Sequence, residues 1–351
     1  MSPYDLVIVG AGPAGMACAR RYQQLRPEAS VAVLERLDDK KHSIYHRMCG
    51  EGISEKGLAE CPDADQDIVL NRITRAVEEY PEDVRVENRI KGLIIDRSAL
   101  LRRMQERFLA AGGVLLNDTF QSARRAAAWE VQMKQGGSIS AAALIGADGS
   151  NSTVRGVLFP SLQPEVIWAE QFLLDQGAER DTIIFTYSAR YLGAYRWTFP
   201  MGSRTKIGFP LGADPRPENC LERHARGIAI GDLRGFASKD AALVGDAAAQ
   251  VNPITFGGIR TAMAAGRMAA AAAAQGDLCL YEEEWARSPF CAARYIPAYR
   301  ELKDLDDAAS AALARPLVGK LAPLRCGIAM VAHPERAQVY RAFMDAMRYG
   351  W

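Results

Sequence analysis

The sequence predicts an α/β protein with a Rossmann-like nucleotide-binding domain, an inserted antiparallel β-sheet and a short helical C-terminal region. Three observations predict this fold class. The first 35 residues have the pattern of a strand, a glycine-rich turn, a helix and a second strand. Four strand-like runs separated by turn residues lie between 167 and 211, as in an antiparallel sheet. After residue 281 the pattern becomes helical, with turns near prolines.

The composition is that of an ordinary globular protein. The chain has 351 residues, of which 49% are hydrophobic and 24% charged, and its net charge is +1. This balance does not indicate a nucleic-acid partner. The seven cysteines are scattered, with neither a C-x-x-C pair nor Cys/His ligand spacing. We therefore expect no metal site, reduced thiols and a cytoplasmic location.

The first motif is a nucleotide-binding turn. An apolar run at 4–9, typical of a buried parallel strand, leads into a glycine turn and then a helical stretch at 16–25. Gly10 permits the tight turn, Gly12 lets the backbone approach a pyrophosphate, and Gly15 lets the helix pack closely on the strand. Free N–H groups at the start of the helix favour phosphates. The expected cofactor-binding residues of this turn are Gly10, Gly12, Pro13, Ala14 and Gly15.

The second strand, at 30–34, ends at an acidic residue. Glu35 follows the glycine turn by about twenty residues, a spacing at which a carboxylate binds the ribose hydroxyls of an adenosine. We assign Glu35 and the adjacent Arg36 to the cofactor site. Taken alone, Glu35 is also compatible with a solvated strand end. This unit does not distinguish FAD from NAD.

A short apolar strand at 142–145 leads into the segment Gly-Ala-Asp-Gly-Ser-Asn-Ser-Thr-Val-Arg, residues 146–155. The segment resembles Gly-Ala-Asp-Gly-x-x-Ser-x-Val-Arg of the para-hydroxybenzoate-hydroxylase-like flavoproteins, in which the aspartate region lies near the FAD pyrophosphate. The resemblance implies that Asp148 and Gly149 contact FAD. The alternative is an Asp-Gly turn followed by a serine that caps a helix.

A third motif follows a strand that delivers Asp246 to its end, where a carboxylate can accept hydrogen bonds from ribityl hydroxyls. A loop then opens a long helix at 259–274, whose N–H groups would face the flavin N1/O2 edge. The Gly-Asp-Ala-Ala segment at 245–248 resembles that of the same superfamily. Two glycines at a helix start are also compatible with a simple turn. The expected cofactor-binding residues here are Gly245, Asp246, Pro253, Gly257, Gly258 and Ile259.

Between these motifs, residues 95–101 resemble the Asp-Arg segment of the superfamily, whose arginine approaches the cofactor. The resemblance implies that Arg97 does so here. Relatives often carry an aspartate where this chain has Leu101, so an exposed arginine at a helix start remains the alternative.

Two segments resemble the geranylgeranyl reductase family, which saturates isoprenoid chains. Residues 195–200 match its Tyr-x-Trp-x-Phe-Pro motif, and residues 49–52 match its Cys-Gly-Glu-Gly segment, whose cysteine lies beside the flavin and the substrate cavity. The resemblance covers roughly residues 1–275 and implies an FAD domain of the type found in para-hydroxybenzoate hydroxylase. It places Gly50 at the cofactor and implies catalytic roles for Cys49, Tyr195 and Trp197.

The chemistry gives these residues defined tasks. Because side chains alternate along a strand, Tyr195 and Trp197 point to one face. Their rings could each stabilise positive charge on a substrate carbon by ~0.5–2 kcal/mol through cation–π contact. Cys49 would position the substrate or deliver a proton. The alternatives are an aromatic core stripe and a small buried cysteine.

We expect a discontinuous FAD-binding domain, residues 1–65, 96–158 and 226–280. The antiparallel substrate domain comprises 66–95 and 159–225, and the helical region comprises 281–351. The expected function is an FAD-dependent reductase of isoprenoid double bonds, with electrons from NAD(P)H or ferredoxin. The alternatives are a flavin-dependent monooxygenase, which would often have histidine where this chain has Ala249, and a non-catalytic flavin-binding protein. A prenyl-lipid substrate would imply peripheral membrane contact, although no basic amphipathic anchor is evident.

Overall fold

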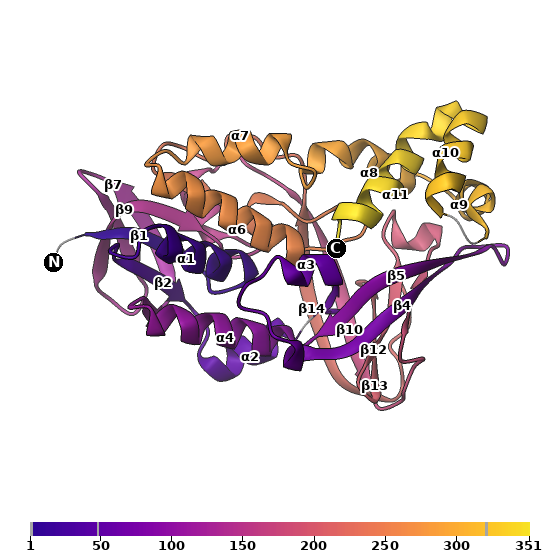
Figure 1. Cartoon of the computed structure of the whole chain (residues 1–351), viewed down its shortest axis with the longest axis horizontal. Coiled ribbons are helices and arrows are strands. Elements are labelled where there is room, and N and C mark those ends of the chain that lie inside the picture. The colour runs from indigo at the N-terminus through magenta and orange to yellow at the C-terminus, as the bar shows by residue number, and fades with distance from the viewer. Residues whose placement is uncertain (1–2, 48, 320–321) are drawn as a thin grey trace.

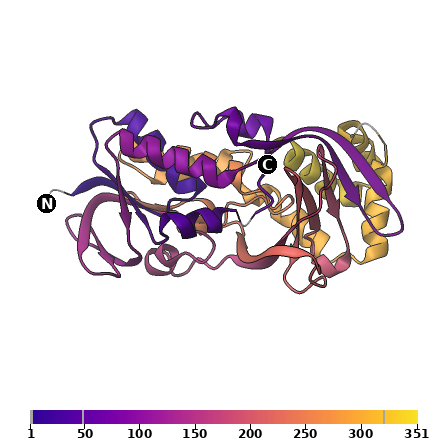
Figure 2. The ribbon, with the colours of Figure 1, turned by 90° about the horizontal axis from the view of Figure 1, so that it is seen from below.

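The computed structural model describes residues 3–47, 49–319 and 322–351. Two β-sheets lie side by side along the long axis, with helices packed against the first sheet and a helical C-terminal region beside the second (Figure 1). The view turned by 90° shows the same division of the molecule (Figure 2). The α/β fold class expected from the sequence is confirmed.

The first sheet has a parallel core. Its strand order is β6-β2-β1-β9-β8-β7, with β15 pairing with β9, and only the β7–β8–β9 part is antiparallel. The sequence analysis did not resolve the hairpin of β7 and β8. The strands are β1 (Tyr4–Val9), β2 (Val31–Glu35), β6 (Val114–Asn117), β7 (Phe120–Arg125), β8 (Trp129–Met133), β9 (Ser138–Gly146) and β15 (Ala241–Leu243).

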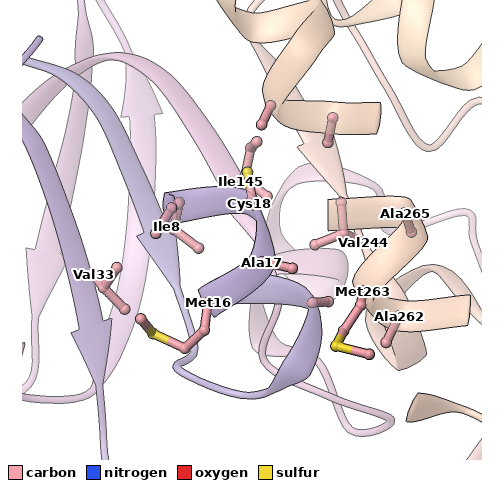
Figure 3. Close-up of a cluster of buried hydrophobic side chains, with 14 of the residues drawn as sticks. Ile8, Met16, Ala17, Cys18, Val33, Ile145, Val244, Ala262, Met263 and Ala265 are labelled. Atoms are coloured by element: carbon pink, nitrogen blue, oxygen red, sulfur yellow. The ribbon is translucent and has the colours of Figure 1, made fainter. Parts of the chain in front are cut away.

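Helix α1 (Pro13–Leu25) packs against both α4 (Arg97–Ala110) and α6 (Ile259–Ala274), and α7 (Cys279–Arg287) packs on α6. Figure 3 shows Ile8 on the sheet side of α1 and Met263 on the α6 side. These side chains belong to one buried apolar cluster that joins the sheet to both helices. The alanine-rich sequence of α6 allows this close approach, because small side chains keep the helix axes near each other.

Two glycines are required by close backbone contacts. Gly10 has a φ of +107°, and a Cβ there would lie 2.4 Å from the carbonyl oxygen of Ala147. A Cβ at Gly266 of α6 would lie 2.2 Å from the carbonyl oxygen of Ala14 in α1. The glycine turn is therefore held between β9 and α6.

The second sheet has the order β14-β10-β13-β12-β11-β4-β5-β3, and within it β11 and β4 pair in parallel. The expected domain boundary at 226 lies inside β14, and β3, expected in the FAD domain, pairs with β5. The strands are β3 (Gly52–Ser54), β4 (Val69–Glu79), β5 (Arg85–Ile95), β10 (Glu165–Leu174), β11 (Thr182–Thr186), β12 (Arg196–Met201), β13 (Arg204–Pro210) and β14 (Cys220–Ile230).

The strand register aligns a row of residues across this sheet. Glu78 of β4 lies opposite Phe185 of β11, Phe185 lies opposite Trp197 of β12, and Trp197 lies opposite Gly208 of β13. Because directly opposed residues share a face of a sheet, this row faces one side.

The remaining helices are short in the first half of the chain and form a cluster at its end. Helices α8 to α11 pack with Tyr80, Val84 and Val86 of the second sheet region in one buried cluster. The bounds are α2 (Asp39–His46), α3 (Glu55–Ala59), α5 (Thr153–Leu158), α8 (Ile296–Lys303), α9 (Asp307–Ala314), α10 (Ala322–Ala332) and α11 (Ala337–Tyr349).

Candidate active site

A cavity of about 600 Å³ extends from the edge of the first sheet to the inner face of the second. Three expected residues do not line it: Gly15, Gly245 and Pro253. Gly15 serves packing, because a Cβ there would overlap the carbonyl oxygen of Gly10 at 1.9 Å. The expected residues that line it are Gly10, Gly12, Pro13, Ala14, Glu35, Arg36, Cys49, Gly50, Arg97, Asp148, Gly149, Tyr195, Trp197, Asp246, Gly257, Gly258 and Ile259.

Backbone donors fix the acidic residue at the nucleotide end. One oxygen of Glu35 accepts a hydrogen bond from the N–H of Ala11 at 2.8 Å, and the other accepts one from the N–H of Leu37 at 2.9 Å. The carboxylate is thus tied to the glycine turn and keeps further lone pairs, since each oxygen accepts more than one hydrogen bond. This geometry suits two adjacent ribose hydroxyls.

Asp148 organises its own turn. Its carboxylate accepts hydrogen bonds from the Ser152 hydroxyl and from the N–H groups of Thr153 and Val154, while the Ser152 hydroxyl accepts one from Arg155 N–H. Burial raises the pKa of Asp148, and these hydrogen bonds oppose the shift. Ser152 therefore caps α5, as in the alternative, while Asp148 and Gly149 also line the cavity.

Helix N-termini face the cavity at two places. Helix α1 begins after Gly12 and α6 begins after Gly258, and neither helix has a side-chain cap. Uncapped N–H groups carry partial positive charge and attract anionic groups. Asp246 follows β15 in the chain and precedes α6. Burial raises its pKa, and the positive charges of Arg226 and Arg97 oppose the shift.

Arg97 is buried, with 5% of its surface exposed, so the alternative of an exposed arginine is wrong. Its Nε donates to the carbonyl oxygen of His46 at 2.8 Å, and its backbone N–H donates to Glu51 at 3.0 Å. Within the described residues its Nη2 has no hydrogen-bond partner. A buried guanidinium group with a free donor is poised for a polar ligand atom.

The loop that carries Cys49 is held by a lysine of β13 that was not among the expected site residues. Lys206 of β13 donates to the carbonyl oxygens of Arg47 at 3.1 Å and Cys49 at 3.0 Å, and it forms an ion pair with Glu51. The Cys49 sulfur accepts a hydrogen bond from the Glu51 N–H at 3.3 Å. Burial raises the pKa of Glu51, and the charges of Lys206 and Arg97 oppose the shift.

Aromatic rings line the cavity on the second sheet. The ring of Tyr195 meets Phe185 edge-on at 4.9 Å and Phe256 at 5.7 Å between centroids, and Trp197 lies 6.5 Å from Tyr195. The Tyr195 hydroxyl donates to the carbonyl oxygen of Thr255. Burial raises the pKa of Tyr195, so this hydroxyl keeps its proton.

His46 and Arg226 also line the cavity and were not among the expected site residues. The guanidinium carbon of Arg226 lies 4.6 Å from the centre of the Tyr45 ring. His46 is buried next to Gly12, and burial lowers its pKa, as do nearby positive charges. No histidine belongs to a metal-binding cluster in the part of the chain that the structure describes.

These features fit an extended dinucleotide. The cavity connects Glu35, two uncapped helix starts and the partner-free Nη2 of Arg97 with an aromatic chamber. Glu35 and the Gly12 turn would hold the adenosine and pyrophosphate. Asp246 and the start of α6 would hold the ribityl chain and the flavin.

Comparisons with known proteins place the chain in a family. Residues 5–166 match the family described as lycopene cyclase protein. Digeranylgeranylglycerophospholipid reductase 2 of Methanopyrus kandleri is 30% identical over 312 residues, which cover 78% of this chain and 77% of that protein. The chain belongs to the geranylgeranyl reductase family. It is an FAD-dependent oxidoreductase of the geranylgeranyl reductase type.

One further relative and two solved structures similar to this geranylgeranyl reductase family member carry names with different substrates. Menaquinone reductase of Mycolicibacterium smegmatis is 25% identical over 339 residues, covering 80% of this chain and 79% of that protein. A geranylgeranyl bacteriochlorophyll reductase-like protein from Thermoplasma acidophilum has a TM-score of 0.80 at 18% identity, with coverage of 98% and 99%. A p-nitrophenol 4-monooxygenase from Pseudomonas putida has a TM-score of 0.62 at 13% identity, with coverage of 99% and 97%. At these identities the structural likeness shows the fold alone.

Proposed function

We propose that this protein saturates carbon–carbon double bonds of a prenyl lipid by adding a hydride to one carbon and a proton to the other. The observation that carries the proposal is the continuity of the cavity. The same space touches the glycine turn at Gly12 and the aromatic chamber at Tyr195 and Trp197. An apolar chain in this chamber would therefore lie against the reactive part of the cofactor.

When bound, reduced FAD would supply the hydride from its N5 atom. An isolated alkene accepts hydride poorly, so protonation must build positive charge on the carbon that the hydride attacks. We assign Tyr195 and Trp197 to stabilise that charge with their ring faces, each by ~0.5–2 kcal/mol. The Tyr195 hydroxyl is bonded to Thr255, which fixes the ring and leaves this residue unsuited as the acid.

We assign the proton to the thiol of Cys49. Cys49 lines the cavity, and its sulfur is oriented by a hydrogen bond from the N–H of Glu51. Lys206 holds the backbone of this residue in place, because its ammonium group donates to the carbonyl oxygen of Cys49 at 3.0 Å. The proton and the hydride together give the saturated carbon–carbon bond, and a solvent proton restores the thiol.

We further propose that NAD(P)H or a reduced ferredoxin supplies the electrons. We also propose that α10 touches a membrane surface. Leu324, Ile328 and Val331 are 61%, 60% and 84% exposed and lie on one side of α10. The opposite side carries Cys326, which packs in the buried cluster that contains Tyr80. None of the described helices is long and apolar enough to cross a bilayer. Flotation with vesicles, lost in Val331→Asp, would support this contact, and unchanged flotation would contradict it.

The central experiment is a single turnover without oxygen. Photoreduced holoprotein is mixed with geranylgeraniol or a digeranylgeranyl lipid, and flavin absorbance and product mass are followed. Reoxidation with a gain of two hydrogens per double bond supports the reductase. Reoxidation only after oxygen is admitted, with an oxygen atom in the product, would identify a monooxygenase. A flavin that neither treatment reoxidises would identify a flavin-binding protein.

Cys49→Ala and Cys49→Ser separate the role of the thiol from a structural role. We expect Cys49→Ala to lower the single-turnover rate about 10²-fold or more while FAD absorbance stays intact, because general acid catalysis contributes roughly 10²–10⁴-fold. Cys49→Ser should retain part of the rate, since a hydroxyl can still relay a proton. An unchanged rate in both variants would remove Cys49 from the mechanism.

A further inference from the structure

One acidic residue lies inside the apolar part of the cavity. Glu78 of β4 lines this space together with Ala76, Ile90, Ile183 and Phe185. In the row across the sheet, Glu78 and Trp197 are separated by a single strand, β11. With strands about 4.8 Å apart, their backbones lie about 10 Å from each other. Glu78 therefore lies in the same cavity as Trp197 but two strands away from it across the sheet.

Neutral groups surround the Glu78 carboxyl. Its oxygens accept hydrogen bonds from the Tyr80 hydroxyl at 2.9 Å and the Asn88 side-chain amide at 3.2 Å. Tyr80 is held in turn by the parallel ring of Tyr187 at 4.5 Å. In the described ranges no lysine, arginine or histidine forms an ion pair with Glu78. Burial raises the pKa of Glu78, and the two hydrogen bonds oppose the shift.

Polar groups of this kind destabilise the fold inside an apolar cavity unless a bound ligand completes their hydrogen bonds. A carboxyl group removed from water and without a cation favours its neutral form, which then has an O–H to donate. Asn88 and Glu78 both line the cavity, so their remaining hydrogen-bonding capacity is directed at whatever occupies it. Hydrocarbon alone would leave that capacity unsatisfied.

We propose that Glu78 and Asn88 form a subsite that binds an uncharged oxygen atom of the prenyl substrate, either a hydroxyl or a carbonyl. The proposal rests on the proposed function and specifies its substrate class. A protonated carboxyl donates to such an oxygen, and the Asn88 amide gives a second polar contact. A phosphate or diphosphate does not fit here, because a buried anion needs a cation and the subsite offers none.

The test compares ligands of one chain length on the oxidised holoprotein. Dissociation constants are measured by flavin absorbance and tryptophan quenching for geranylgeraniol, for its hydrocarbon analogue without the hydroxyl, for geranylgeranyl diphosphate and for a naphthoquinone bearing four isoprene units. We expect the alcohol or the quinone to bind about three- to tenfold tighter than the hydrocarbon, the effect of one neutral hydrogen bond. The larger preference identifies hydroxyl or carbonyl as the natural group.

Glu78→Leu should abolish this preference, whereas Glu78→Gln, which keeps hydrogen-bonding groups, should retain most of it. The matched control is Glu79→Leu on the same strand, because Glu79 bonds to Thr186 and does not line the cavity. It should leave the preference unchanged. If Glu78→Leu does not retain FAD, the wild-type ligand series and Glu78→Gln still decide.

Equal binding of alcohol, quinone and hydrocarbon by the wild type would overturn the subsite. So would an unchanged preference in Glu78→Leu, or tightest binding of the diphosphate with the same dependence on Glu78. Failure of the proposed function has a different signature. In that case the ligands would bind with the Glu78-dependent preference, but none would reoxidise the reduced flavin. Reoxidation of the reduced flavin together with equal binding of alcohol, quinone and hydrocarbon would reject the subsite alone.

Discussion

Lys206 and Glu51 form a buried ion pair, and Lys206 also donates to the carbonyl oxygen of Cys49. Only 2% of Lys206 and 1% of Glu51 is exposed. The lysine also binds the carbonyl oxygens of Arg47 and Cys49, so it connects β13 to both sides of the loop. The position of the thiol therefore depends on a residue more than 150 positions away in the sequence.

Lys206→Met should leave Glu51 as an uncompensated buried charge and lower the free energy of unfolding by about 3–5 kcal/mol. The double variant Lys206→Met/Glu51→Gln should recover part of the loss, because it removes that charge. Chemical denaturation measures both effects. Lys134→Met, at an exposed lysine, is the control and should change stability little. Equal stability of Lys206→Met and the control would show that the pair holds nothing in place.

Gly266→Ala should separate α1 from α6. Its methyl group would meet the carbonyl oxygen of Ala14 at 2.2 Å, and a backbone atom cannot move without its helix. We expect a loss of about 1–3 kcal/mol in stability, as for overpacked cores, together with weaker FAD retention. Thermal unfolding and release of FAD on dilution measure the two effects.

The matched control for that substitution is Gly327→Ala in α10, where a Cβ would meet nothing within 4 Å. It should stabilise the protein by about 0.5–1 kcal/mol, since alanine favours a helix over glycine. If both alanine variants behave alike, the contact between Gly266 and Ala14 does not position the cofactor turn.

The two aromatic residues should respond differently to loss of ring and loss of hydroxyl. Tyr195→Phe keeps the ring and should change the single-turnover rate less than about threefold, the lower end of the cation–π range. Tyr195→Leu and Trp197→Leu should each slow it by about 2- to 30-fold, since each removes a ring worth ~0.5–2 kcal/mol. Stopped-flow flavin reoxidation measures the rates. Equal slowing by Tyr195→Phe and Tyr195→Leu would assign the effect to the hydroxyl.

His46 should make stability depend on pH in the mildly acidic range. Burial holds the pKa of His46 below its usual value. At mildly acidic pH His46 is therefore protonated in the unfolded chain but still neutral in the folded chain. Stability should be constant above about pH 6.5 and fall as the pH decreases from there, by up to ~1.4 kcal/mol per pH unit. Denaturation curves at pH 8, 7, 6 and 5.5 should show a smaller fall in His46→Gln. The same fall in both proteins would assign it to other groups.

The cofactor side of the site could be predicted because its signals are local. Gly12 and Glu35 belong to one strand–turn–helix–strand unit, and Asp148 and Asp246 each follow a strand. Strands β1, β9 and β15 are parallel neighbours, so their carboxyl ends meet at one edge. Each motif therefore implied its place in the cavity. The capping role of Ser152 was foreseen only as an alternative, and the hydrogen bonds from Thr153 and Val154 to the Asp148 carboxylate were not foreseen.

The substrate side depends on pairing between distant strands, which a single sequence does not specify. Glu78 aligns with Trp197 only once the order β12-β11-β4 is known, and Lys206 meets Glu51 only once the loop before β3 is placed against β13. A charged residue at an inward position of a strand was the available signal for both. The expected division at 226 lies inside β14, because the pairing of β14 with β10 joins residues about 55 positions apart and leaves no local signal.

Trp197 lies where a side chain at position 208 would be, since a Cβ on Gly208 would come within 1.9 Å of the indole. The ring therefore packs against the backbone of β13 at Gly208. Enlarging residue 208 would lift the indole into the chamber and shorten the space that a lipid can fill. The absence of a side chain at residue 208 therefore sets how much of the chamber is open to substrate in this protein.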